Sequence, residues 1–265
     1  MNPFEKGCPP LSPVEFLDVS FSYDEAPVLT NLTLSIPQGV TSLTGPNGAG
    51  KSTFLLLASG RLLPSTGTVL LNGKDTTGLD DGEKNRLCSL VYQNMEFETE
   101  EPLGDLLAFV FANGFLKASD KGFLKTVVTT FELGDLQARK TQTLSKGEMQ
   151  RAVMAFSLLY GSQVVVMDEP VFALEEAQKR RALGFLAEYT RSAGMTLLYS
   201  AHELDLTRDF SDQVLLFPKG RPPLLGTAAA LLTREVLEEA YQVPYVLLHQ
   251  KEKLHRSALM QLGTP

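Results

Sequence analysis

The sequence predicts an α/β fold with a largely parallel sheet. Short apolar segments of β-strand character alternate along the chain with segments of helical character. Such alternation is typical of parallel sheets, whose strands are joined by helical crossovers. A glycine-rich segment at 45–53 lies between a strand-like and a helix-like stretch, and a mostly helical block at 101–160 interrupts the pattern. We expect this block to be an insertion.

The strands are predicted from apolar patterning. Residues 14–21 and 28–36 show alternating apolar residues, and Leu32, Leu34 and Ile36 share one face of the second segment. Continuous apolar runs that end in polar residues favour buried parallel strands. Further strands are expected at 40–44, at 66–75 (closed by an Asn-Gly turn), and at 86–92, 164–169, 196–202 and 213–218.

Composition narrows the class of protein. Of the 265 residues, 43% are hydrophobic and 21% are charged, which indicates a soluble globular protein rather than a disordered one. The net charge of −7 argues against a nucleic-acid partner, because phosphate backbones are bound by basic surfaces. Cys8 and Cys88 lack metal-ligand spacing and are expected to be reduced thiols. We find neither a secretory signal layout nor an apolar run that could cross a bilayer, and expect a soluble chain.

The segment GPNGAGKST matches the phosphate-loop pattern G-x-x-x-x-G-K-[ST] between a predicted strand and a helix predicted over 52–59. Glycines let backbone N–H groups close around phosphate oxygens, and the helix N-terminus adds its positive dipole end. In this motif the lysine bridges the β- and γ-phosphates and the hydroxyl ligates Mg²⁺. The residues expected to bind the nucleotide are Gly45, Pro46, Asn47, Gly48, Ala49, Gly50, Lys51, Ser52 and Thr53.

Two acids complete the predicted phosphoryl-transfer site. The run VVVMDEP at 164–170 reads as a buried strand that ends in Asp168 and Glu169. An acid at this place reaches the metal, so we expect Asp168 to be a Mg²⁺ ligand. Glu169 is expected to orient or deprotonate the attacking water.

Beyond these two motifs, the chain resembles the ATPase subunit of ABC transporters over most of its length. TLSKGEMQR at 143–151 is similar to the family's signature LSGGQ/E-x-QR and precedes the Asp-Glu strand, as in the family. Tyr23 in VSFSYDEAPVL, Gln93 in LVYQN and His202 in LLYSAHELD match further family positions, and all the motifs occur in the family's order.

The resemblance implies a role for each matching residue. Tyr23 would stack on adenine, Gln93 would sense Mg²⁺ and the attacking water, and His202 would contact the γ-phosphate. Gln93, Glu169 and His202 are therefore the expected catalytic residues, and Ser52, Gln93 and Asp168 the expected metal-binding residues. In the signature, the residues expected to bind the nucleotide held by a second subunit are Ser145, Gly147 and Glu148.

The resemblance also implies a fold. It is a P-loop NTPase with a RecA-like core, an N-terminal antiparallel β subdomain and an inserted helical subdomain. We expect a single ABC ATPase domain over 1–265. Its parts are expected to be the nucleotide-binding core with the β subdomain (1–93 and 161–218), the helical signature subdomain (94–160) and a C-terminal extension (219–265).

The sequence departs from the family pattern at one position and in two short segments. Lys146 replaces the first signature glycine, Phe172-Ala173-Leu174-Glu175 replaces Ser-Ala-Leu-Asp, and Ala155-Phe156-Ser157-Leu158 replaces Ala-Arg-Ala-Leu. If position 146 required positive φ, a lysine there would cost about 1 kcal/mol, whereas in ordinary backbone it would cost almost nothing. We expect a tolerated, active site.

The family's partners and location follow from the same resemblance. They are a second ATPase subunit (a copy or a paralogue), permease subunits that dock near Gln93 and within Met95–Leu107, and a substrate-binding protein. The chain would lie peripherally on the cytoplasmic face of the inner membrane. The tail at 226–248 and Glu148 resemble importers of iron-siderophore, haem and cobalamin, with a short helix, Tyr-x-Val-Pro and a final strand. His249 and His255 match no motif position.

Several functions remain open at this level. Zinc or manganese importers are close rivals to iron-chelate, haem or cobalamin importers. A non-transport ABC ATPase that assembles iron–sulfur clusters would need no permease. A nucleotide-binding module without hydrolysis is a third class, but Glu169 and His202 argue against it because a decayed site commonly loses such residues.

Overall fold

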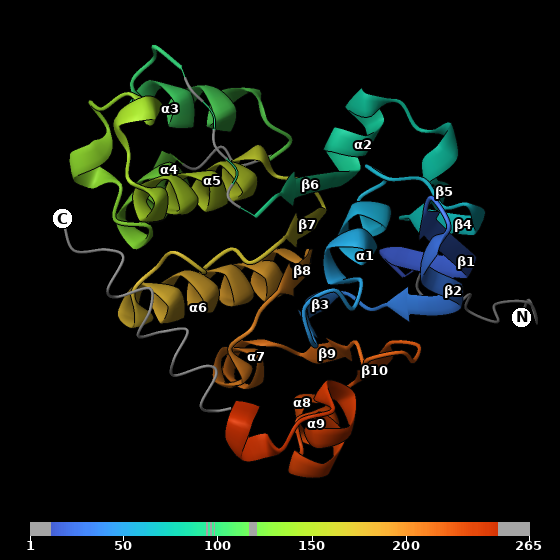
Figure 1. Ribbon diagram of the computed structural model, residues 1–265. Helices are drawn as coiled ribbons and strands as arrows, with labels where there is room; N and C mark the ends of the chain where they lie inside the picture. Colours follow the sequence, from blue (N-terminus) through green and yellow to red (C-terminus); the bar gives the residue numbers. More distant parts are fainter. Residues whose placement is uncertain (1–11, 94, 96, 98, 117–120, 249–265) are drawn as a thin grey trace, which may run out of the picture.

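A largely parallel sheet forms the centre of the computed structural model, which describes residues 12–248 except 94, 96, 98 and 117–120 (Figure 1). Within these residues the strand order is β10-β9-β3-β8-β7-β6, and only β10 runs antiparallel to its neighbour. The strands are β3 (Gly39–Thr44), β6 (Cys88–Val91), β7 (Val164–Met167), β8 (Thr196–Ser200), β9 (Gln213–Leu216) and β10 (Leu224–Gly226). The predicted α/β fold with a largely parallel sheet is confirmed.

A second sheet is antiparallel and lies toward the N-terminus, as the family resemblance implied. Its strand order is β2-β1-β4-β5. The strands are β1 (Val14–Tyr23), β2 (Ala26–Ile36), β4 (Thr66–Leu71) and β5 (Lys74–Asp75). Asn72 and Gly73 both have positive φ, 48° and 76°, and join β4 to β5 in the predicted Asn-Gly turn.

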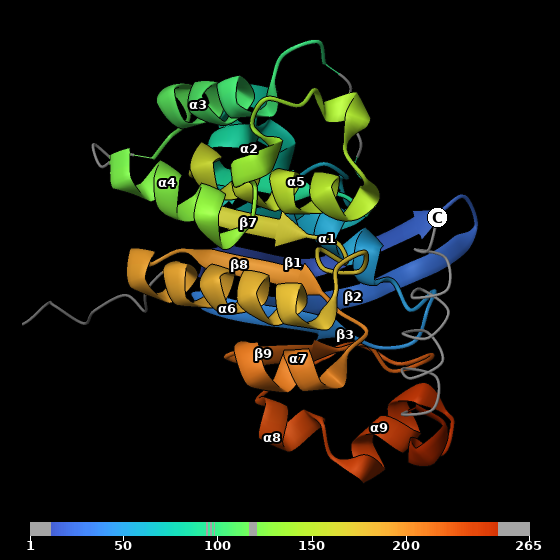
Figure 2. The same ribbon diagram turned by 90° about the vertical axis from the view of Figure 1, so that its left-hand side faces the viewer.

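Helices lie on both faces of the parallel sheet and beyond its ends (Figures 1 and 2). The helices α3, α4 and α5 lie beside β6 and β7, whereas α8 and α9 lie beyond β9 (Figure 1). No helix within the described residues is both long enough and apolar enough to span a membrane. The helices are α1 (Lys51–Ala58), α2 (Asp81–Leu87), α3 (Leu103–Asn113), α4 (Lys121–Thr130), α5 (Lys146–Tyr160), α6 (Glu176–Ala193), α7 (Leu204–Phe210), α8 (Ala228–Leu231) and α9 (Arg234–Tyr241).

The strand β7 shows why a continuous apolar run fits this sheet. Val164 and Val166 pack in the core between the two sheets, together with Phe54 of α1. Val165 and Met167 pack in the other core, against α5 and α6. Successive side chains of a strand face opposite sides, so a strand covered on both faces must be apolar at every position. Both faces of β7 are buried, so polar side chains can reach solvent only at the ends of the strand.

Two local expectations were wrong. The strand predicted at 86–92 begins only at Cys88, because a helix covers 81–87. Asp80 starts this helix through a capping box with Glu83, in which each side chain accepts the other residue's backbone N–H. The final strand expected after Tyr-x-Val-Pro is also absent from the described residues, since the backbone is helical at 245–248. Cys8, His249 and His255 lie outside the described residues.

Candidate functional site

The loop between β3 and α1 is shaped by glycines. Gly45 and Gly50 have φ of 145° and 96°, a region that favours glycine. A Cβ on Gly45 would lie 2.4 Å from the carbonyl oxygen of Phe217, and one on Gly50 would lie 3.0 Å from Cγ1 of Val28. The first N–H groups of α1 border this loop, as phosphate binding requires. All the predicted nucleotide contacts in 45–53 lie in the loop or in the first turn of α1.

The side chain of Lys51 lies across the same loop. Its Nζ donates to the carbonyl oxygens of Gly45 at 2.8 Å and Pro46 at 3.1 Å. Burial lowers the pKa of this lysine, and the nearby negative charges of Glu169 and Asp168 act in the opposite direction. A further anion at the loop would favour the charged lysine in the same way.

The two predicted acids follow β7 and are held by a serine from the neighbouring strand. The Asp168 N–H donates to the carbonyl oxygen of Val91 at 2.8 Å. The Ser200 hydroxyl donates to Oδ1 of Asp168 at 2.5 Å and accepts the Glu169 N–H at 2.8 Å. Glu169 has φ of 49°, which is uncommon for a residue other than glycine. Ser200 therefore fixes the acid turn, and sequence reasoning gave it no role.

The three predicted catalytic residues are in direct contact. Nε2 of Gln93 donates to Oε2 of Glu169 at 2.8 Å, and Nε2 of His202 lies 2.7 Å from Oε1 of the same carboxylate. These residues follow β6, β7 and β8, which are neighbours in the sheet. The Glu169 side chain is only 14% exposed, so its carboxylate is held largely by protein groups. The arrangement can position a water molecule and accept its proton.

The residues predicted to bind metal suit Mg²⁺. Magnesium prefers oxygen ligands and is commonly held by one or two protein carboxylates together with substrate phosphates. Asp168 supplies a carboxylate that Ser200 orients, and such hydrogen bonds tune metal ligands. Gln93 uses its amide nitrogen toward Glu169, so its oxygen is the atom suited to a metal. Ser52 is exposed at the first turn of α1. These oxygen donors fit the ion, and their role as ligands stays a prediction.

Tyr23 lies at the end of β1 and is 49% exposed. Its ring meets Phe21 edge to face, with 4.9 Å between ring centroids. Tyr23 pairs with Ala26 across the turn into β2. Because Val28 of that strand lies against Gly50, this turn is near the phosphate loop. An exposed aromatic ring there could stack on a nucleotide base, which stays a prediction.

The signature segment forms the N-terminus of α5. Ser145 is the N-cap, and its hydroxyl accepts the Glu148 N–H at 3.3 Å while Oε2 of Glu148 accepts the Ser145 N–H at 2.7 Å. Lys146 is the first helical residue and does not have positive φ, so it carries no backbone strain. A Cβ on Gly147, in contrast, would lie 3.0 Å from the carbonyl oxygen of Ala173. A side chain at 147 would therefore press against this carbonyl, whereas the backbone at 146 is that of an ordinary helical residue.

Two further contacts link the predicted site residues to their surroundings. Gln150 of α5 donates from Nε2 to the Glu169 carbonyl oxygen at 2.8 Å and accepts the Ala173 N–H at 2.9 Å. Lys179 of α6 forms a buried ion pair with Glu203, which directly follows the predicted catalytic histidine. Gln150 belongs to the quoted signature segment, but its role depends on a tertiary contact that the sequence pattern does not reveal.

Comparison with known proteins gives a consistent result. A family model described as "ABC transporter" matches residues 29–172. The cobalt import ATP-binding protein CbiO of Rhodobacter capsulatus is 33% identical over 221 residues, which are 77% of this chain and 75% of that protein. The iron(3+)-hydroxamate import ATP-binding protein FhuC of Bacillus subtilis is 28% identical over 231 residues, 85% of this chain and 86% of that protein.

A solved structure supports the fold. It is a dimeric ATP-binding cassette in a post-hydrolysis state bound to ADP and Pi, with a TM-score of 0.69 and 22% identity. The match covers 81% of this chain and 98% of that one.

Ser200 provides a test of how the acid turn is held. We expect Ser200→Ala to lower the free energy of unfolding by about 1–3 kcal/mol, because the partly buried Glu169 N–H and the Asp168 carboxylate both lose their hydrogen-bond partner. Urea denaturation of the purified chain would measure this. Ser192→Ala, which removes an exposed serine hydroxyl that donates to the Tyr189 carbonyl, is the matched control and should change stability by less than about 0.5 kcal/mol. Equal effects of the two substitutions would contradict the role assigned to Ser200.

Proposed function

Because the chain belongs to the ABC transporter family, we propose that it is the ATP-binding subunit of an importer and acts as a dimer with separate permease subunits. The chain is an ABC-type ATPase. The observation that carries the mechanism is the contact of Glu169 with both Gln93 and His202. It joins the three catalytic candidates beside the phosphate loop.

In the proposed reaction the phosphate loop binds the β- and γ-phosphates. Lys51 exchanges its contacts with loop carbonyls for phosphate oxygens, which restores a counter-charge to the buried ammonium. Ser52, Asp168 and Gln93 would hold Mg²⁺, which neutralises charge on the transferred group. Tyr23 would stack on the adenine ring.

Hydrolysis needs a base for water. Glu169 accepts a proton as the water oxygen bonds to the γ-phosphorus, and the bond from that phosphorus to the oxygen shared with the β-phosphate breaks. ADP and phosphate are the products. His202 and Gln93 hold the Glu169 carboxylate and would turn toward the γ-phosphate and the water. Glu169, which contacts both Gln93 and His202, is therefore held in one orientation, as a general base requires.

The second half of each site would come from another copy or from a paralogue. We propose that Ser145 and Gly147, at the N-terminus of α5, face the γ-phosphate of ATP bound to the partner, with Glu148 beside them. Helix N-termini favour anions, which supports this assignment.

The transported substrate is proposed to be a metal ion or a metal chelate. Relatives are named for the import of cobalt and of iron(3+)-hydroxamate, and these names support the class but not one substrate. We place the chain on the inner face of the membrane against its permease, with exposed Tyr92 and Met95 near the docking surface. The division into core (1–93 and 161–218), helical subdomain (94–160) and C-terminal extension (219–265) remains part of this proposal, as does a substrate-binding protein.

Co-purification tests the permease. The tagged full chain, cross-linked in membranes and then solubilised in detergent, should retain an integral membrane protein. A soluble partner alone would overturn the transport assignment and favour an assembly factor. If the chain is active as an ATPase but retains no membrane protein, the enzyme assignment stands and the permease assignment is contradicted.

Glu169→Gln tests the base. The substitution keeps the size of the side chain but removes proton acceptance, so we expect steady-state ATPase activity to fall by about 10²- to 10⁴-fold. Binding of a fluorescent ATP analogue should persist, because the phosphate loop is unchanged. An ATPase rate equal to that of the wild type would show that Glu169 is not the base.

Lys146→Gly tests the departure from the signature. Since Lys146 has regular helical backbone, we expect the ATPase rate to change by less than about tenfold, or about 1.4 kcal/mol. Gly147→Ala is the contrasting variant and should lower the rate more, because its Cβ meets the Ala173 carbonyl. A rise above tenfold in Lys146→Gly would show that the lysine impairs the site.

A further inference from the structure

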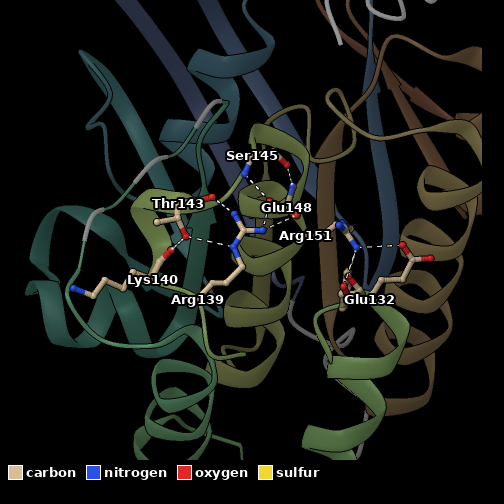
Figure 3. A network of polar contacts seen from close by, with 8 residues as sticks. Glu132, Arg139, Lys140, Thr143, Ser145, Glu148 and Arg151 are labelled. Atoms are coloured by element: carbon tan, nitrogen blue, oxygen red, sulfur yellow. Dashed lines mark hydrogen bonds and ion pairs between the residues drawn. The ribbon is translucent and has the colours of Figure 1, made fainter. Parts of the chain in front are cut away.

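Arg139 lies just before the signature and binds several groups around it (Figure 3). Its Nη1 lies 3.1 Å from Oε1 and 3.3 Å from Oε2 of Glu148. Nη2 donates to the Thr143 carbonyl oxygen, and Nε lies 3.4 Å from the Thr143 hydroxyl. One guanidinium group therefore joins the loop before α5 to the first turn of that helix.

The backbone of Arg139 is itself anchored. Its N–H donates to the Leu136 carbonyl at 2.9 Å, and its carbonyl accepts the Leu103 N–H at the start of α3 at 2.8 Å. The guanidinium is thus presented from a fixed point. Nη1 alone contacts both carboxylate oxygens of Glu148, and such contacts between ionised groups are stronger than hydrogen bonds between neutral groups.

Glu148 is an anion in the first turn of α5, where a carboxylate stabilises the helix but repels a second anion. Burial alone would raise the pKa of Glu148, but the hydrogen bonds with Ser145 and the charges of Arg139 and Arg151 together hold the pKa below its usual value. The carboxylate is therefore ionised at neutral pH. Under the proposed function, the same helix N-terminus must receive a triphosphate, which a bare carboxylate would repel.

The capping geometry leaves suitable donors for that triphosphate. The Ser145 hydroxyl oxygen accepts the Glu148 N–H, so its hydrogen can be given to a phosphate oxygen. The N–H groups of Lys146 and Gly147 belong to the first helical turn, which has no partners within the helix. The Ser145 N–H, in contrast, is bound by Glu148. These donors can bind a phosphate best when the charge of the Glu148 carboxylate is neutralised and its position is fixed.

We propose that Arg139 is a positioning residue of the signature: it neutralises Glu148 and holds it in the capping geometry, so that the N-terminus of α5 can bind a nucleoside triphosphate carried by a second copy of this chain. The proposal rests on the proposed function. Arg139 does not itself touch the phosphate. Its effect is electrostatic, because it compensates one specific carboxylate.

Full-length chains that carry Glu169→Gln, which slows hydrolysis, provide the test. In this background we compare Arg139→Gln, Arg139→Lys, Glu148→Gln and the Arg139→Gln/Glu148→Gln double variant. Arg234→Gln, which removes an exposed arginine paired with Glu238, is the matched control. Fluorescent ATP-analogue binding measures the phosphate loop, and sedimentation at 0.1 M and 0.5 M salt with ATP measures dimer formation.

We expect Arg139→Gln to weaken ATP-dependent dimerisation by about tenfold, with analogue binding unchanged, because the uncompensated Glu148 carboxylate would then repel the triphosphate. The defect should shrink at 0.5 M salt, because exposed charges are screened. Arg139→Lys should lose less than Arg139→Gln. The double variant should bind its partner within about threefold of Glu148→Gln alone, because no anion is then left to neutralise.

The possible outcomes distinguish the role proposed for Arg139 from the composite ATP site on which that role depends. If the background chain does not dimerise with ATP, the composite site of the proposed function is wrong, and the role of Arg139 falls with it. If the background dimerises and the double variant is as defective as Arg139→Gln, at both salt concentrations, Arg139 is only a structural support and the inference is overturned. Rescue by Glu148→Gln, with salt dependence, supports it.

Discussion

The carboxylate of Glu169 is the contact on which the site depends. Glu169 follows β7, and its carboxylate accepts a hydrogen bond from Gln93 after β6 and lies 2.7 Å from Nε2 of His202 after β8. These three strands are neighbours in the sheet. The parallel sheet makes this meeting possible, because the carboxyl ends of parallel strands lie on one edge. The covered faces of the sheet leave that edge as the place for polar side chains. Ser200 and Gln150 then hold the backbone of Glu169 from β8 and α5.

The sequence predicted the parts that follow from local chemistry. The glycines of the phosphate loop, the apolar run of β7 and the acids after it are each recognised from a few consecutive residues, and the order of motifs identified the family. Ser200 was beyond reach because its role depends on strand register. Met167 pairs with Tyr199, and this register places the next residues, Asp168 and Ser200, side by side. Alternation and hydrophobicity do not specify register between strands 30 residues apart in the chain.

The errors have a similar cause. The segment 86–92 contains a strand pattern, but the capping box of Asp80 and Glu83 starts a helix that extends to Leu87 and shortens the strand. Lys146, in contrast, was expected to be tolerated: it departs from the family pattern in residue type, and its ordinary helical backbone carries no strain. An ordinary first helical position accepts lysine, and the tight contact lies at the neighbouring Gly147, close to the Ala173 carbonyl. A sequence motif therefore contains positions where the structure restricts the residue type and positions where other residues fit equally well.

Charge balance connects these observations. Under the proposed function, a chain of net charge −7 binds a triphosphate beside Asp168 and Glu169, and a partner's triphosphate beside Glu148. The net charge of the protein repels a triphosphate, so individual cationic side chains must lie close to the bound phosphates and to the carboxylates beside them. Lys51 is buried at the phosphate loop, and desolvation lowers its pKa by disfavouring the charged ammonium group. A phosphate bound in the loop would offset this cost by supplying a negative charge. Arg139 balances Glu148 at the signature before any ligand arrives. In the proposed composite site, the two halves therefore differ: a bound phosphate would favour the charged form of Lys51, whereas Arg139 is already paired with the acid that would repel the phosphate.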